Sequence, residues 1–108
     1  MTRKAVILDS AKADFRDIKK RVKKQFGDLV WIDVNQEFKE NINRIATNHL
    51  LGTQFEELGA FGCENFRKTL VRQTRIIYEF NNDLLIVHMF IHTKRDFGTH
   101  LEKRLLEP

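Results

Sequence analysis

The stretch IIYEFNNDLLIVHMFIHTKRDF, residues 76–97, decides the fold. Two apolar runs flank Asn81-Asn82-Asp83, and Asn and Asp favour tight turns because their side chains hydrogen-bond to the local backbone. Residues 76–80 alternate with a period of two, which is typical of a strand. Residues 84–91 are apolar on both faces, as in strands that are covered on both sides. The stretch therefore predicts a β-hairpin whose second strand is either central in its sheet or covered on its second side.

Ionisable residues lie within and directly after this second strand. Strict alternation predicts that His88 faces the same side as Ile86 and Phe90, where a structural role is expected. The cluster His92-Thr93-Lys94-Arg95-Asp96 then ends the strand. One interpretation is a solvated turn in which Asp96 caps a final helix. The other is a functional edge, since polar groups carried by a strand end are held more rigidly than those on a free loop.

The first half of the chain predicts two amphipathic helices. A short strand over residues 3–8 precedes Ser10, which is expected to cap a helix from Ala11 to Phe26 that Gly27 terminates. A second helix is expected over residues 29–49. Apolar residues recur at helical spacing in both segments, namely Ala11, Phe15, Ile18, Val22 and Phe26 in the first and Trp31, Val34, Phe38, Ile42 and Ile45 in the second.

The element order predicts the fold class. Two helices joined by a short turn form an antiparallel hairpin. Residues 50–63 contain glycines among aromatic residues and are expected to form an anchored loop, and a further strand carries Phe66, Thr69 and Val71. A short helix over 99–106 would close the chain. The order β-α-α-β-β-β predicts an α+β, two-layer fold in which a helical hairpin packs on a mostly antiparallel sheet.

Composition limits the classes of function. The 108 residues suit one domain spanning 1–108, with a net charge of +4 and a pI near 9.4, which favours an acidic partner. The single Cys63 excludes an intramolecular disulfide and a multi-cysteine zinc site, and no secretion signal is evident, so we expect a cytoplasmic protein. Common nucleotide-binding and zinc-enzyme motifs do not occur, and no metal or cofactor is expected.

Two groups of basic residues have alternative interpretations. The lysines and arginines of the first helix form either a solvated face or a surface that steers an acidic partner. Arg67, Lys68, Arg72 and Arg75 are either dispersed surface charges or a binding patch.

Three segments resemble the RelE/ParE superfamily of bacterial toxin–antitoxin toxins. They are AKADFRDIKKRVKKQFG, TRIIYEF and IVHMFIHTKRDFGTHLEKRLL, and the resemblance that rests on them covers nearly the whole length of the chain. An apolar strand followed by His-x-basic-basic-Asp and then by Leu-x-x-Arg-Leu is similar to the ParE branch.

The resemblance implies one of two activities. RelE-like members cut mRNA on the ribosome and typically use a tyrosine near the C-terminus, whereas ParE-like members are implied to poison DNA gyrase. Here Leu101 stands where that tyrosine aligns, and the only tyrosine, Tyr78, is expected in the core. We therefore expect a gyrase inhibitor without catalytic residues. In the alternative, an mRNA endonuclease, Arg75, Arg95 and Lys94 would stabilise charge and His92 would transfer protons.

The resemblance also implies partners. These are a cognate antitoxin with an acidic or amphipathic segment, DNA gyrase, and further copies in a homodimer or a toxin–antitoxin hetero-oligomer, with no membrane. Growth arrest and stabilisation of a plasmid or prophage would follow, unless the chain is a divergent member that has lost toxicity. The expected partner-binding residues are Arg67, Lys68, Arg72, Arg75, His92, Lys94, Arg95, Lys103 and Arg104.

Overall fold

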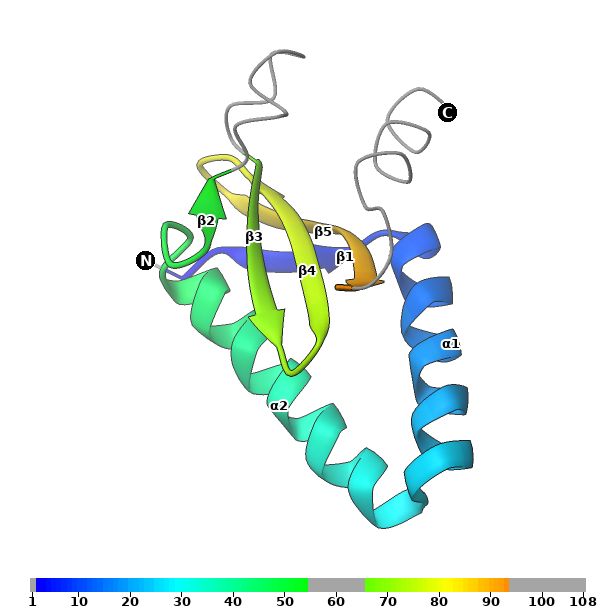
Figure 1. Cartoon of the computed structure of the whole chain (residues 1–108). Coiled ribbons are helices and arrows are strands. Elements are labelled where there is room, and N and C mark those ends of the chain that lie inside the picture. Colours follow the sequence, from blue (N-terminus) through cyan, green and yellow to red (C-terminus); the bar gives the residue numbers. More distant parts are fainter. Residues whose placement is uncertain (1, 55–65, 94–108) are drawn as a thin grey trace.

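A computed structural model describes residues 2–54 and 66–93 of the chain (Figure 1). The elements in chain order are β1 (Lys4–Ile7), α1 (Asp9–Phe26), α2 (Asp28–Thr47), β2 (Thr53–Gln54), β3 (Phe66–Val71), β4 (Thr74–Phe80) and β5 (Leu84–His92). The predicted α+β class is confirmed.

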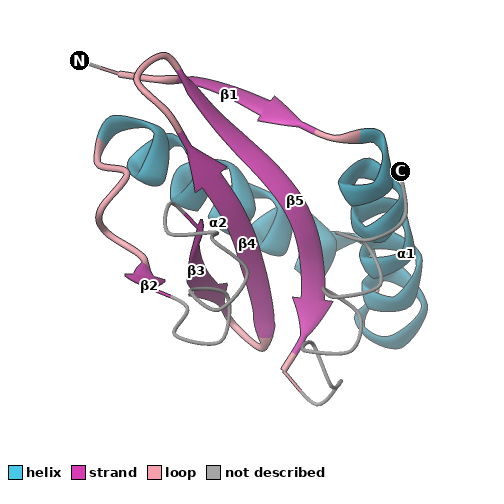
Figure 2. Ribbon diagram, turned by 90° about the horizontal axis from the view of Figure 1, so that it is seen from above, coloured by secondary structure: helices cyan, strands magenta, loops and turns pink. Residues whose placement is uncertain are grey.

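The five strands of the described residues form one sheet in the order β1-β5-β4-β3-β2, which Figure 2 shows from one edge to the other. β1 pairs with β5 in parallel, and the other neighbouring pairs are antiparallel. The expected central position of the apolar strand is therefore confirmed, because β5 lies between β1 and β4. The turn before β5 is built as expected, since Oδ1 of Asn81 accepts hydrogen bonds from the amides of Asp83 and Leu84.

α1 and α2 form the predicted hairpin around Gly27. Figure 1 shows that the distance between the two helices increases from this turn towards the sheet. Gly27 has φ of +90°, a conformation that residues with a side chain rarely adopt. The predicted cap was wrong. Leu8 is the N-cap of α1 without a side-chain bond, and Ser10 lies inside the helix. α2 also ends at Thr47, two residues before the expected end.

An aromatic cluster joins the helices to the sheet. The ring of Phe15 in α1 lies 5.4 Å from Trp31, 5.3 Å from Phe38 and 5.2 Å from Phe90, measured between ring centroids. The edge-on geometry of the first two contacts is favourable because the ring edge is positive and the ring face negative. Phe90 of β5 thus packs between both helices, and this cluster forms the centre of the core.

A β-bulge in β5 corrects one prediction. Ile77 pairs with Met89, whereas the next residue, Tyr78, pairs with Val87, so that His88 is the extra residue. An extra residue reverses the alternation of side chains beyond it. Phe90 therefore points to the helices, and His88 does not share its face. Instead, Nε2 of His88 lies 3.1 Å from Oε1 of Glu79, and its ring centroid lies 4.9 Å from that of Phe66.

Several expectations concern residues outside the described ranges. They include the position of Cys63, the final helix over 99–106, and the basic residues from Lys94 onward. The described part of the expected loop contains a feature that the sequence did not indicate, since Thr53 and Gln54 form the short edge strand β2 beside β3.

Candidate functional site

The strand register separates the predicted basic residues between the two faces of the sheet. Arg67 pairs with Tyr78, whose side chain belongs to the helix-facing core. Lys68 follows Arg67 and therefore points to the opposite face. Arg75 pairs with Leu70 and lies on that same opposite face. The four basic residues of β3, β4 and their turn do not form one patch.

Arg67 is positioned as a structural residue. Its Nη1 donates a hydrogen bond of 2.7 Å to the carbonyl oxygen of Gly52, and its side chain is partly buried. Nearby, the hydroxyl of Tyr78 donates to the carbonyl oxygen of His49 at 2.9 Å and accepts from the amide of Gly52 at 3.0 Å. These bonds attach the segment after α2 to the sheet.

Arg72 occupies the turn between β3 and β4 with φ of +53°. Its Nε lies 2.6 Å from Oε2 of Glu37 on α2, which links the turn to the helix. Both side chains are about half exposed, and ion pairs in that setting contribute little to stability. Arg72 is therefore still accessible from solvent at the end of the sheet.

His92 ends β5 beside the same turn. Its ring Nε2 lies 3.2 Å from Oε1 of Gln73, and the backbone amide of Thr93 donates to the carbonyl oxygen of Gln73 at 2.9 Å. His92 pairs with Thr74 in the ladder, one position beyond the pair of Arg75 with Ile91. Because neighbouring pairs alternate, His92 and Arg75 point to opposite faces of the sheet.

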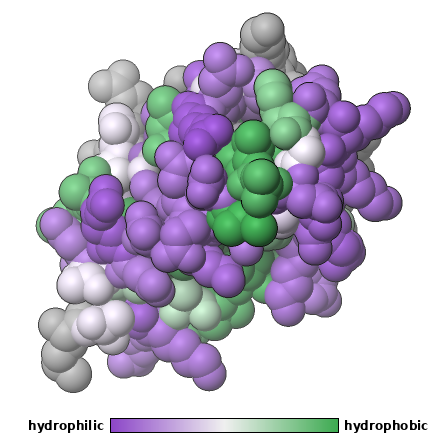
Figure 3. All heavy atoms as spheres, turned by 90° about the horizontal axis from the view of Figure 1, so that it is seen from below, coloured by the Kyte–Doolittle hydropathy of each residue, from purple (hydrophilic) through white to green (hydrophobic). Residues whose placement is uncertain are grey.

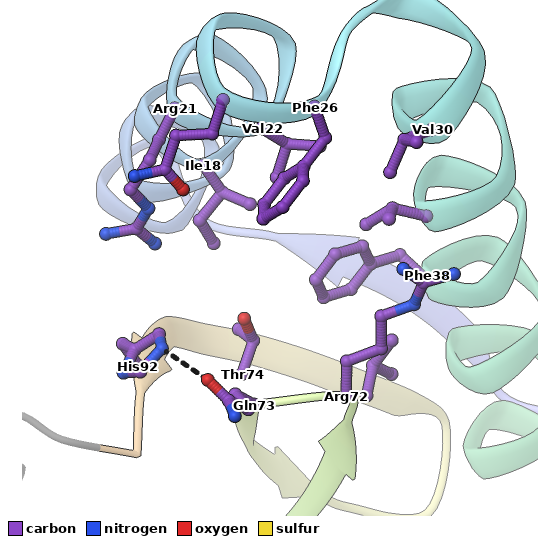
Figure 4. Close-up of a pocket in the computed structure, with 13 residues that line it drawn as sticks. Ile18, Arg21, Val22, Phe26, Val30, Phe38, Arg72, Gln73, Thr74 and His92 are labelled. Atoms are coloured by element: carbon purple, nitrogen blue, oxygen red, sulfur yellow. Dashed lines mark hydrogen bonds between the residues drawn. The ribbon is translucent and has the colours of Figure 1, made fainter.

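An apolar groove of about 390 Å³ opens between the two helices and this end of the sheet (Figure 4). Its apolar lining comes from Ile18, Val22, Phe26, Val30, Val34, Phe38 and Val71, and its ionisable lining residues are Arg21, Arg72 and His92. Phe26 and Leu29, at the turn between the helices, are 64% and 81% exposed. Figure 3 shows an apolar patch surrounded by hydrophilic surface on the underside of the molecule. In the sequence, Ile18, Val22 and Phe26 fall on one helical stripe, but the groove was not predicted, because helical spacing does not show how far two helices diverge.

A histidine-centred cluster was also missed. Arg3 donates from Nη1 to Nδ1 of His49 at 2.6 Å and from Nε to the carbonyl oxygen of Asn81 at 2.6 Å. The ring of Phe80 lies 4.5 Å from that of His49. Desolvation, followed by the charges of Arg3 and Arg67, lowers the pKa of His49. Only long-range pairing brings these residues together, so their spacing in the sequence gave no indication.

In residues 2–54 and 66–93, no group of three or more His, Cys, Asp or Glu residues is arranged to hold a metal ion. Over the same residues, no helix combines the length and apolar character needed to cross a membrane.

Comparison with known proteins identifies the family. Residues 6–97 match the family described as "ParE toxin of type II toxin-antitoxin system, parDE". The chain belongs to the ParE toxin family. This agrees with the ParE-branch resemblance of the sequence, and membership in a toxin–antitoxin system implies a cognate antitoxin as a partner. Among curated proteins, no match was found.

The fold of this ParE-family chain is similar to a solved structure titled "Chromosomal ParDE TA system from P. aeruginosa". The TM-score is 0.70 with 11% sequence identity, and the match covers 86% of this chain and 98% of the other. At that identity the likeness concerns the fold alone. It confirms the helical hairpin on a mixed, mostly antiparallel sheet.

Proposed function

We propose that this ParE-family chain is a toxin that inhibits DNA gyrase by protein–protein contact and is neutralised by its cognate antitoxin. The observation that carries the proposal is the family match over residues 6–97, which includes the end of β1, both helices and the strands β2 to β5. Growth arrest and plasmid or prophage stabilisation belong to the same proposal, as does action in the cytoplasm.

The position of Tyr78 supports gyrase inhibition rather than RNA cleavage. This residue is the only tyrosine of the chain, its side chain is fully buried, and its hydroxyl is engaged by two backbone groups. A buried hydroxyl cannot reach a phosphodiester. In addition, Arg75 and His92 point to opposite faces of the sheet, whereas cleavage through a 2′-hydroxyl needs acid–base and charge-stabilising groups around one phosphate.

The apolar groove supports neutralisation by a folding-on-binding segment. Its apolar floor suits one side of an amphipathic helix, and Arg21 and Arg72 at its rim suit acidic residues on the flanks. A flexible segment can cover such a surface because it orders only on contact. In this proposal the antitoxin occupies the groove, and the basic residues after β5 contact the target.

Purified gyrase tests the target directly. Toxin is released from its antitoxin complex and added to gyrase, relaxed plasmid and ATP, and supercoiling is followed on agarose gels. We expect inhibition of supercoiling that cognate antitoxin reverses, and no effect on a type I topoisomerase under the same conditions. Normal supercoiling at a large molar excess of folded toxin would refute gyrase as the target.

A second experiment tests whether the toxin acts on the ribosome instead of gyrase. Toxin is added to a translating extract, and the mRNA is mapped for cleavage in and around the ribosomal A site. We expect intact transcripts, and in cells we expect DNA breaks to precede translation arrest. Cleavage at defined codon positions would instead establish the endonuclease alternative.

A further inference from the structure

The charge of the chain is concentrated in one helix. α1 contains seven Lys or Arg residues and three Asp residues, a net charge of +4. The whole chain has the same formal net charge of +4, from 19 basic and 15 acidic residues. The rest of the sequence therefore contains twelve of each and is neutral. The basic character of this protein is a property of α1.

Five of these cations form a row on one face of α1, which we call the basic stripe. Spacings of three and four residues place Lys12, Arg16, Lys19, Lys20 and Lys23 along one side of a helix, and all five are exposed. Only Lys23 has an ion pair among the described residues, with Asp28 at 3.7 Å, and the Asp28 side chain is 81% exposed. Such a pair is readily exchanged for another anion.

The acidic residues of α1 interrupt the stripe little. Oδ2 of Asp14 accepts a hydrogen bond from the backbone amide of Phe90 at 3.2 Å, so this carboxylate faces the sheet. Asp17 lies beside Lys20, Arg21 and Lys24, at the edge of the stripe. Asp9 is on the stripe side but precedes its first lysine by three residues.

Packing fixes the stripe as a straight, outward-facing row. The opposite side of α1 is held in the core through Ala11 and Ile18, with Phe15 and Val22 packed against it. Figure 1 shows α1 at the margin of the molecule, with the sheet and α2 to one side of it. A buried apolar face cannot insert into lipid, which argues against a membrane surface as the partner.

The length of the stripe matches a DNA strand. From Lys12 to Lys23 the helix rises about 16 Å, at about 1.5 Å per residue. One strand of B-form DNA carries a phosphate about every 3.4 Å of axis, so about five phosphates lie along that length. The stripe has no aromatic or aliphatic anchor of the kind that protein interfaces use, and lysine is depleted at such interfaces.

We propose that the basic stripe of α1 binds the phosphate backbone of duplex DNA without reading its sequence. Lysine and arginine contacts to phosphates position a protein on DNA but carry no sequence information. The stripe shares no residue with the proposed gyrase contact, and the inference stands whether or not gyrase is the target.

Salt-dependent binding tests the proposal. The full-length protein is titrated into a fluorescent duplex of about 24 base pairs, and anisotropy is recorded between about 50 and 200 mM NaCl. Five phosphate contacts predict a slope of log K against log salt of about −4.5, a loss of affinity of about 500-fold over that range. Arg16→Gln/Lys19→Gln/Lys23→Gln leaves two contacts and should reduce the slope to about −1.8, or about 12-fold.

A matched variant separates the stripe from net charge. Lys4→Gln/Lys39→Gln/Arg44→Gln removes three exposed cations elsewhere and should retain the wild-type slope. An equal reduction of the salt-dependence slope in both variants, each with a native circular dichroism spectrum, would overturn the proposal. Equal or tighter binding of poly-glutamate, an RNA duplex or anionic vesicles would also overturn the assignment to DNA.

Discussion

Replacing Tyr78 with phenylalanine removes a single hydroxyl from the most strongly buried polar position described in the sheet. The side chain has no exposed surface, and its hydroxyl donates to the carbonyl oxygen of His49 and accepts from the amide of Gly52. Phenylalanine keeps the ring in the core, so the substitution tests these two hydrogen bonds alone. It should loosen the segment after α2 without disturbing the aromatic cluster.

The expected cost follows from the bonds lost. Each hydrogen bond contributes about 1 kcal/mol net, and the amide of Gly52, left without its buried acceptor, adds a desolvation penalty that begins at about 1 kcal/mol. We therefore expect the free energy of unfolding to fall by about 3 kcal/mol or more. For a domain of this size that corresponds to a decrease in Tm of about 12 °C or more.

Urea titration followed by circular dichroism measures this loss, with an unchanged m-value as the sign that the folded state is otherwise intact. Thr47→Val is the matched control. It removes an exposed hydroxyl that bonds only to the Asn43 carbonyl oxygen within α2 and should cost less than about 0.5 kcal/mol. A loss below about 0.5 kcal/mol for Tyr78→Phe as well would show that the hydroxyl anchors nothing.

Alkaline titration gives an independent check. Burial raises the pKa of Tyr78, while the hydrogen bond with Gly52 and the charge of Arg67 act in the opposite direction. A raised pKa stabilises the folded state below the ordinary value of about 10, and that contribution is lost as the pH rises through the folded-state pKa. The stability difference between wild type and Tyr78→Phe should therefore shrink above about pH 10. Because the chain has one tyrosine, absorbance near about 295 nm reports this ionisation alone.

The pKa of His49 is lowered, so neutral His49 should stabilise the fold above about pH 6.5, and this contribution should decrease as the pH falls through the folded-state pKa. In urea titrations, His49→Asn should flatten the dependence of the unfolding free energy on pH. An equal pH dependence in both proteins would contradict this prediction. Val87→Asp should abolish soluble expression even beside the antitoxin, because Val87 is fully buried in the central strand and an unpaired buried charge is very costly; a soluble, folded variant would exclude this. Lys94→Ala/Arg95→Ala and Lys103→Ala/Arg104→Ala should abolish growth arrest while antitoxin binding persists, and Lys19→Ala/Lys20→Ala should remain toxic; the reverse pattern would show that the residues after β5 form only a solvated turn.

Much of the fold was predictable because its determinants are local. The apolar stripes of α1 and α2 identified buried residues such as Trp31 and Phe38, and the Asn-rich turn fixed the hairpin of β4 and β5. The buried position of Tyr78 also followed from alternation along β4. In each case, residues close in sequence contain the whole pattern.

The start of α1 was missed for a local reason. Ser10 has the side chain of a helix cap, yet Leu8 is the N-cap of α1, and the amide of Lys12 donates to the carbonyl oxygen of Leu8. The other features depend on contacts between distant segments. The two-residue strand β2 exists only by pairing with β3. The division of Arg67 and Lys68 between two faces depends on which face the helices cover, and the sequence of β3 does not specify this.

The bulge at His88 has the largest consequence for function, because it sets the direction of every later side chain in β5. With uninterrupted alternation from Val87, Phe90 would leave the aromatic cluster and His92 would leave the groove. With the bulge, His92 and Arg72 line the groove, while Arg75 and Lys68 belong to the opposite face. A flat protein surface can contact only one of these pairs, whereas a flexible segment can pass around the end of the sheet and contact both. The proposed antitoxin and the proposed target can therefore bind different basic side chains, and neutralisation need not use the residues that act on the target.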